Sequence, residues 1–152
     1  YGIILNVNTP YLDWTSVLIN DYGEVLRPYA MPVKTWINEG IRVTFEATGT
    51  NFWKPIHTLI TREITNPLTH EKETMLPEQA IDRVTALKMT TTWASEYMMA
   101  EDTIGTLEPG KYADFAVLER DFFTMPIEEI RGLQVTMTGL GGEIVFARQA
   151  SN

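Results

Sequence analysis

The sequence predicts an α/β fold in which the front half alternates strands and helices and the tail is antiparallel β-structure. Two short apolar runs of β-forming residues, 1–9 and 41–45, enclose a segment with helical signals. Further on, β-forming runs at 115–119, 133–138 and 143–148 are separated by glycine and proline turns. A strand, a connection and a second strand within about 45 residues indicate one right-handed βαβ unit. We therefore expect parallel pairing in the front half and hairpin pairing in the tail.

The first strand and its connection follow from local signals. The apolar run of Ile3, Ile4, Leu5 and Val7 is typical of a strand that is buried on both faces, and Pro10 ends it. Residues 11–31 are aromatic and irregular, and we expect a long loop there with at most one helical turn. Pro32 is suited to the first turn of a short helix that closes at Gly40.

After the second strand, residues 46–51 form a turn and residues 52–64 are expected to be helical. The residues that carry the helical spacing there are Ile56, Leu59, Ile60 and Ile64. A polar loop covers 66–75, and a long helix is expected from 77 to 99, weakened at Thr90–Thr92. The inner face predicted for this helix contains Ile81, Val84, Leu87 and Ala94 or Met98.

From about residue 103 the pattern changes to turns and short strands. Gly105 and Pro109-Gly110 provide tight turns, and Asp114 can accept hydrogen bonds from backbone amides before a buried strand begins. Residues 125–130 can form one short helical turn, and the glycines at 139–142 predict the turn of a hairpin.

Composition excludes several classes of protein. The 152 residues include 44% hydrophobic and 21% charged residues, which favours a globular chain over a disordered one. A net charge of −8 with only 12 scattered basic residues argues against nucleic-acid binding. The chain has no cysteine, so disulfides and cysteine-based zinc sites are excluded.

Location is predicted from what the sequence lacks. No apolar run approaches the roughly 18 residues that a membrane span needs, and no signal peptide is visible. We expect a cytoplasmic protein with no membrane partner. The chain begins with Tyr1 rather than Met, so we expect the natural start to lie upstream or to have been removed.

The segment TIGTLEPGKYADFAVLERD (103–121) resembles a family signature. It is similar to the return from barrel to small β-domain in metal-dependent amidohydrolases of the imidazolonepropionase and N-substituted formamide deformylase type. The matching positions are Ile104, Gly105, Leu107, Pro109, Gly110, Lys111, Ala113 and Asp114. The ending GLGGEIVF (139–146) resembles the closing hairpin of that family. Residues 77–98 resemble a helix of that family that ends in a T-x-N-x-A run, and they depart from it at Thr92, where Asn is usual.

This resemblance implies a specific place in a larger fold. Residues 1–102 would form the last two βα units of a TIM-barrel amidohydrolase, and residues 103–152 the antiparallel strands of a small composite β-domain. The signature itself is expected to be structural, with a catalytic role of Asp114 or Lys111 as the alternative.

The resemblance also implies a metal site that this chain does not contain. Such enzymes use a His-x-His pair on the first strand, a carboxylate or carboxylated lysine on the fourth, and histidines on the fifth and sixth. This chain has no His-x-His, and its only histidines are His57 and His70. The resemblance leads us to expect a divalent metal in the full-length protein, with zinc as the first candidate. We expect no bound metal and no activity from this chain alone.

One catalytic residue of the family is expected within the chain. An Asp at the end of the eighth strand activates the metal-bound water, in text close to F-G-S-D-x-P. Here Thr48 stands at the position of that Asp, and a hydroxyl cannot accept a proton as a carboxylate does. Glu46, two residues earlier and on the same side of the strand, is a candidate substitute. Altered chemistry or a degenerate site are the other interpretations.

Candidate substrate-binding residues follow the second strand, where such barrels build their pockets. Asn51, Trp53 and His57 are the residues proposed from the sequence, with packing in an amphipathic helix as the alternative for His57. Aromatic residues of the first connection, Tyr11, Trp14 and Tyr22, have a similar claim.

The resemblance implies a hydrolase that acts on non-peptide carbon–nitrogen bonds, such as amides or cyclic amides, through a metal-activated water. The alternative is a non-catalytic binding or regulatory domain on a degenerate amidohydrolase scaffold. The expected partners are a small amide-type substrate and either a second copy of the chain or an N-terminal portion that covers the bare strands.

Overall fold

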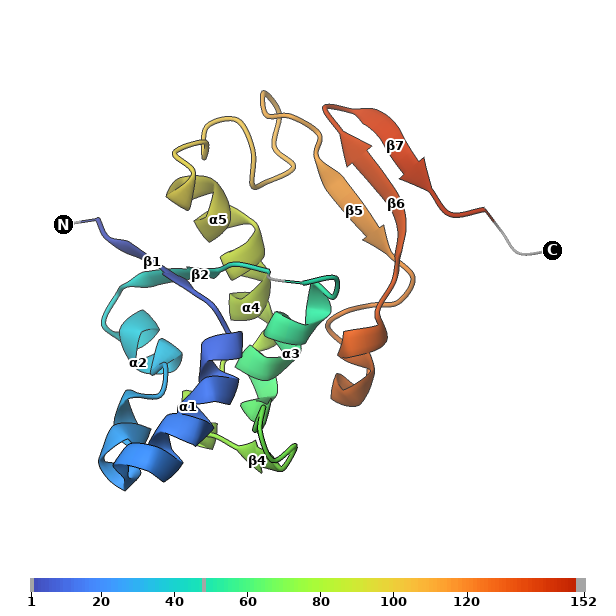
Figure 1. The fold of residues 1–152 in the computed structure, drawn as a ribbon. Helices are drawn as coiled ribbons and strands as arrows, with labels where there is room; N and C mark the ends of the chain where they lie inside the picture. Colours follow the sequence, from blue (N-terminus) through green and yellow to red (C-terminus); the bar gives the residue numbers. More distant parts are fainter. Residues whose placement is uncertain (1, 48, 150–152) are drawn as a thin grey trace.

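The computed structural model describes residues 2–47 and 49–149, and it is a mixed α/β structure (Figure 1). Strands β1 (Ile4–Val7) and β2 (Arg42–Phe45) pair in parallel, with Leu5 opposite Val43. This pairing confirms the predicted strands and their orientation. Helices connect the two strands, as a parallel pair requires.

The connection between β1 and β2 is more helical than the sequence analysis predicted. Helix α1 (Pro10–Tyr22) and the 3-10 helix η1 (Glu24–Tyr29) occupy the segment that we expected to be a loop. Pro10 is at the first helical position, which its fixed φ favours. The buried residues of α1 share one face: Leu12, Ser16 and Ile19. The predicted short helix is confirmed as α2 (Val33–Asn38).

Helix α3 (Trp53–Thr61) is shorter than predicted, and a hairpin follows it. Arg62 adopts a left-handed conformation with φ 61°, which ends the helix. Strands β3 (Glu63–Thr65) and β4 (Lys72–Thr74) then pair antiparallel, so the predicted end of the helix and part of the predicted polar loop are β-structure. Ile64 is buried from this strand rather than from a helix.

Arg62 is fully buried and holds three segments together. Its Nε donates to the Met75 carbonyl at 2.9 Å, Nη1 to Met31 at 3.2 Å and Nη2 to Ala30 at 2.8 Å. Burial lowers the pKa of the guanidinium to about 10, and attraction to Glu78 opposes this shift. The hairpin is thereby fixed against the end of η1.

The predicted long helix is broken into three pieces. These are η2 (Pro77–Gln79), α4 (Arg83–Thr90) and α5 (Thr92–Tyr97). Asp82 caps α4 by accepting a 2.7 Å hydrogen bond from the Thr85 amide. The break at Thr91 falls within the threonine run that weakens the helix. The predicted inner face is only partly correct, because Ile81 is buried but Val84 and Met98 are exposed, while Ala86 and Met89 are buried in their place.

The tail forms the predicted antiparallel sheet, in the order β5-β6-β7. Its strands are β5 (Phe115–Leu118), β6 (Val135–Leu140) and β7 (Glu143–Ala147), with the 3-10 helix η3 (Ile127–Gly132) before β6. Asp114 accepts a 2.7 Å hydrogen bond from the Gly141 amide, which confirms its predicted structural contact. Strand β5 is half-exposed rather than buried.

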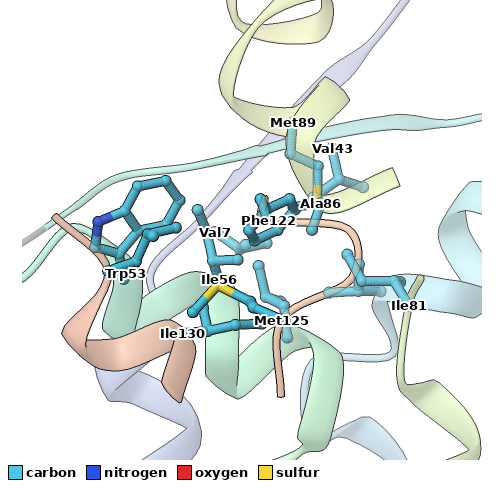
Figure 2. Close-up of a cluster of buried hydrophobic side chains, with 13 residues drawn as sticks. Val7, Val43, Trp53, Ile56, Ile81, Ala86, Met89, Phe122, Met125 and Ile130 are labelled. Atoms are coloured by element: carbon cyan, nitrogen blue, oxygen red, sulfur yellow. The ribbon is translucent and has the colours of Figure 1, made fainter. Parts of the chain in front are cut away.

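The larger of two apolar clusters in the described residues joins the front of the chain to residues 122–133 (Figure 2). Val7 and Val43 from the parallel strands meet Ile56 of α3 and Met89 of α4 there. Residues from the later segment complete the cluster: Phe122, Met125, Ile130 and Leu133. The sheet β5-β6-β7 lies to one side of this core (Figure 1). The division into domains near residue 103 stays a prediction.

Candidate functional site

The carboxyl ends of β1 and β2 meet at one edge of the parallel pair, and polar residues follow both strands. Asn8 comes directly after β1, and Glu46 directly after β2. Asn8 Nδ2 donates a 2.5 Å hydrogen bond to Glu46 Oε1, and the Glu46 amide donates to the Val7 carbonyl at 3.0 Å. This edge is where α/β sheets place their ligands.

A cavity of about 460 Å³ opens at the same edge. Its lining residues are Asn6, Val7, Asn8, Tyr11, Thr15, Tyr29, Met31, Trp36 and Glu46. The aromatic side chains come from α1, η1 and α2, which lie together on one side of the β1–β2 pair (Figure 1). The volume is within the range of small-molecule sites, roughly 300–1,000 Å³.

Glu46 is the proposed catalytic residue that the structure brings to this cavity, where it is exposed. Thr48, at the position of the family Asp, lies outside the described residues. Of the aromatic residues proposed from the first connection, Tyr11 lines the cavity. Trp14 and Tyr22 are exposed on α1 and are not part of its lining.

Asn51 and Trp53 have structural contacts at the start of α3. Asn51 Oδ1 accepts from the amides of Trp53 (3.0 Å) and Lys54 (3.1 Å), and its Nδ2 donates to the Arg131 carbonyl at 3.0 Å. Trp53 is 9% exposed and its ring lies 5.8 Å from that of Phe122. Neither residue lines the cavity beside Glu46.

His57 is buried in α3, with 3% of its surface exposed. Its Nδ1 lies 3.3 Å from Thr61 Oγ1, and its Nε2 lies 4.0 Å from Glu63 Oε2. Burial and, secondarily, the charge of Arg131 lower the pKa of His57 below its usual 6.5, while Glu63 and Glu128 oppose this shift. The structure places this side chain in the packing of α3, away from the cavity lining.

The described residues do not fit a resident metal. No group of three or more histidine, aspartate or glutamate side chains within this part of the chain is arranged to hold a metal ion. His57 is enclosed in α3, whereas His70 is exposed in the turn between β3 and β4. The Glu46 carboxylate accepts a hydrogen bond from the side-chain amide of Asn8, which is not a histidine or carboxylate ligand.

Several cavity residues were missed by the sequence analysis. Asn6 and Asn8 interrupt the apolar run of β1 with a period of two, and this alternation was the available signal. Tyr29, Met31 and Trp36 gave no local signal, because the folding of η1 and α2 against β1 brings them to the cavity.

Among the described residues, no helix is long and apolar enough to cross a membrane.

Comparison with known proteins identifies the family of this sequence. A solved amidohydrolase from Thermotoga maritima is similar, with 16% identity and a TM-score of 0.43. The alignment covers 97% of this chain and 44% of that one, so the chain spans less than half the length of the solved protein. A search of curated proteins gave no match. The sequence model of the amidohydrolase family matches residues 5–146, nearly the entire chain. The chain belongs to the amidohydrolase family.

Proposed function

We propose that the protein carrying this chain is a hydrolase that acts on carbon–nitrogen bonds other than peptide bonds, with amides or cyclic amides as substrates. Family membership supports a hydrolase. The observation that carries the proposal is the Glu46–Asn8 pair at the carboxyl edge of β1 and β2, beside a cavity of substrate size.

In this proposal, Glu46 accepts the proton of the attacking water. An amide is hydrolysed when a water oxygen bonds to the carbonyl carbon, the carbon–nitrogen bond breaks, and a proton passes from the water to the leaving nitrogen. The Glu46 carboxylate can accept that proton from the water and then donate it to the leaving nitrogen. Asn8 Nδ2 holds one carboxylate oxygen at 2.5 Å, which fixes the direction of the other.

Amidohydrolases are in general metal-dependent, and a bound divalent metal would polarise the carbonyl and acidify the water. The described residues do not form a site for such an ion, so zinc dependence is a proposal that requires ligands beyond them. The chemistry assigned to this chain is proton transfer at Glu46 and positioning of the substrate in the cavity.

Two variants of the full-length protein test the role of Glu46 in an amide-hydrolysis assay. If Glu46 is the base, Glu46→Gln should lower kcat by about 10²–10⁴-fold with little change in KM. Thr48→Asp should then change the rate little. The reverse pattern, a rate increase for Thr48→Asp and no loss for Glu46→Gln, would assign the base to the position of Thr48 instead.

Glu39→Gln is the matched control, because this exposed carboxylate precedes β2 and lies at the opposite end of the strand. Its activity should equal that of the native protein. A full-length protein, supplied with divalent metal, that hydrolyses no amide or cyclic amide contradicts the proposed function.

A further inference from the structure

Part of the wall of the cavity beside Glu46 is formed where η1 turns into α2. Tyr29 at the end of η1, Met31 in the turn and Trp36 of α2 all line the cavity. The Met31 amide donates to the Tyr29 carbonyl at 2.8 Å, and the Met31 carbonyl accepts from the Val33 amide at 2.8 Å. The backbone of Met31 therefore sets how η1 and α2 meet at the cavity.

Met31 has a backbone conformation that side chains disfavour. Its φ is 49°, in the left-handed region. A residue other than glycine persists there only where the surrounding structure holds it in place. Met31 also packs against both apolar clusters, so the cavity wall and the two cores share this residue.

The buried guanidinium of Arg62 holds this turn. Its Nη1 and Nη2 donate to the carbonyls of Met31 and Ala30, so two consecutive peptide groups of the turn bind one planar donor group. Arg62 is also fixed to Met75, because its Nε donates to the Met75 carbonyl and its own carbonyl accepts from the Met75 amide, both at 2.9 Å. A buried charge is costly unless its donors are bonded, so the guanidinium and the two turn carbonyls constrain each other.

We propose that Arg62 is a positioning residue for the substrate. By holding the carbonyls of Ala30 and Met31, it keeps Met31 in its left-handed conformation and places Tyr29 and Met31 in the cavity wall. Arg62 is fully buried and does not line the cavity, so it acts through this wall. The inference rests on the proposed function in taking this cavity as the substrate site, and it holds equally with a divalent metal bound at the Glu46 edge.

Arg62→Lys in the full-length protein, supplied with divalent metal, tests this role with 4-nitroacetanilide and the cyclic imide succinimide as probes. A lysine ammonium keeps the charge but cannot reproduce the planar set of donors. A displaced wall weakens ground-state and transition-state binding alike, so kcat/KM should fall by about tenfold to 10²-fold, mainly through a higher KM. A purely structural role would reduce the fraction of folded protein, which lowers the apparent kcat and leaves KM unchanged.

Arg83→Lys is the matched control. Arg83 also donates to two main-chain carbonyls, those of Phe122 at 2.5 Å and Met125 at 2.7 Å, and none of these residues lines the cavity. This variant should leave KM unchanged. Met31→Ala keeps Arg62 and removes part of the wall, so it should raise KM and decides the case if Arg62→Lys does not fold.

Hydrogen exchange of the full-length protein, followed by mass spectrometry, examines the turn without any substrate. The amides of Met31 and Val33 should exchange faster in Arg62→Lys than in the native protein, because the turn has lost its hold. In Arg83→Lys the same amides should exchange at the native rate.

An unchanged KM in a folded Arg62→Lys variant overturns the inference, and so does an unchanged KM in Met31→Ala. Native exchange rates at Met31 and Val33 in folded Arg62→Lys overturn it as well. The proposed function fails separately, when the native full-length protein hydrolyses no amide, and the exchange rates then decide alone whether Arg62 holds the turn.

Discussion

His57 is a buried side chain whose lowered pKa links the stability of the fold to pH. It lies where α3 packs against η3, and Glu63 of β3 together with Glu128 and Arg131 of η3 are the charged groups around it. Since burial and Arg131 lower its pKa, the folded chain favours the neutral ring more than the unfolded chain does. The unfolded chain therefore binds more protons below pH 6.5.

We predict that the His57 contribution to stability is fully present above pH 6.5 and is lost as the pH falls from 6.5 through the lowered pKa of the folded state. Urea unfolding at about pH 7.5 and about pH 5 measures this. His57→Gln should lose less stability on acidification than the native chain. His70→Asn, which changes the exposed histidine, should keep the native pH dependence, and an identical pH dependence for His57→Gln would contradict the prediction.

At the level of helices and turns, the signature glycines are positioned by different constraints. Gly105 and Gly110 both have φ +95°, a conformation that side chains disfavour. A Cβ on Gly105 would lie 2.2 Å from Ser95 Oγ and 2.7 Å from Ser95 Cβ, against the buried side of α5. A Cβ on Gly110 would meet nothing within 4 Å.

We predict that Gly105→Ala lowers the free energy of unfolding by about 1–3 kcal/mol more than Gly110→Ala does. Both variants share the backbone strain, so the difference measures the contact with α5. In a Ser95→Gly background the excess cost of Gly105→Ala should shrink, because the two clashing atoms are gone. Equal destabilisation by Gly105→Ala and Gly110→Ala in chemical denaturation would show that α5 imposes no constraint here.

Local signals predicted the strands of the parallel pair and of the tail, but they missed β3 and β4, which lie in the predicted helix end and polar loop. The runs at β1, β2 and β5 to β7 were identified correctly, and so was the hairpin turn, because strand formers and glycines act within a few residues. Helix α1 was missed since its aromatic residues obscure the i, i+4, i+7 spacing of its buried face. The long helix was overextended because the break at Asp82 and Thr91 depends on capping and on packing against β2.

The architecture of the chain leaves its parallel sheet small. Within the described residues, β1 and β2 pair only with each other, so each strand has an edge without a strand partner. Parallel strands are normally buried inside larger sheets. Ile3, just before β1, is 62% exposed, and on β7 the apolar residues Val145 and Phe146 are also exposed.

We predict that the 152-residue chain self-associates in solution through the β1–β2 pair. Sedimentation velocity should show an average mass that rises with protein concentration. Ile3→Lys should shift the distribution toward monomer, because a charge next to β1 opposes pairing with a second copy, whereas Val145→Lys on β7 should not. A chain that stays monomeric at every concentration contradicts this prediction.

The sequence by itself determined the amidohydrolase family, the positions of β1, β2 and β5 to β7, and the place of Glu46 after β2, because each depends on a short contiguous segment. The signature around Gly105 and Asp114 is local, and so is the end of a strand. Only the tertiary structure decided which side chains share a site. It placed Trp53 and His57 in packed contacts and brought Asn8, Tyr29 and Trp36 to the cavity beside Glu46. These residues lie far apart in the chain, and their meeting depends on the packing of helices against β1 and β2, which no local pattern encodes.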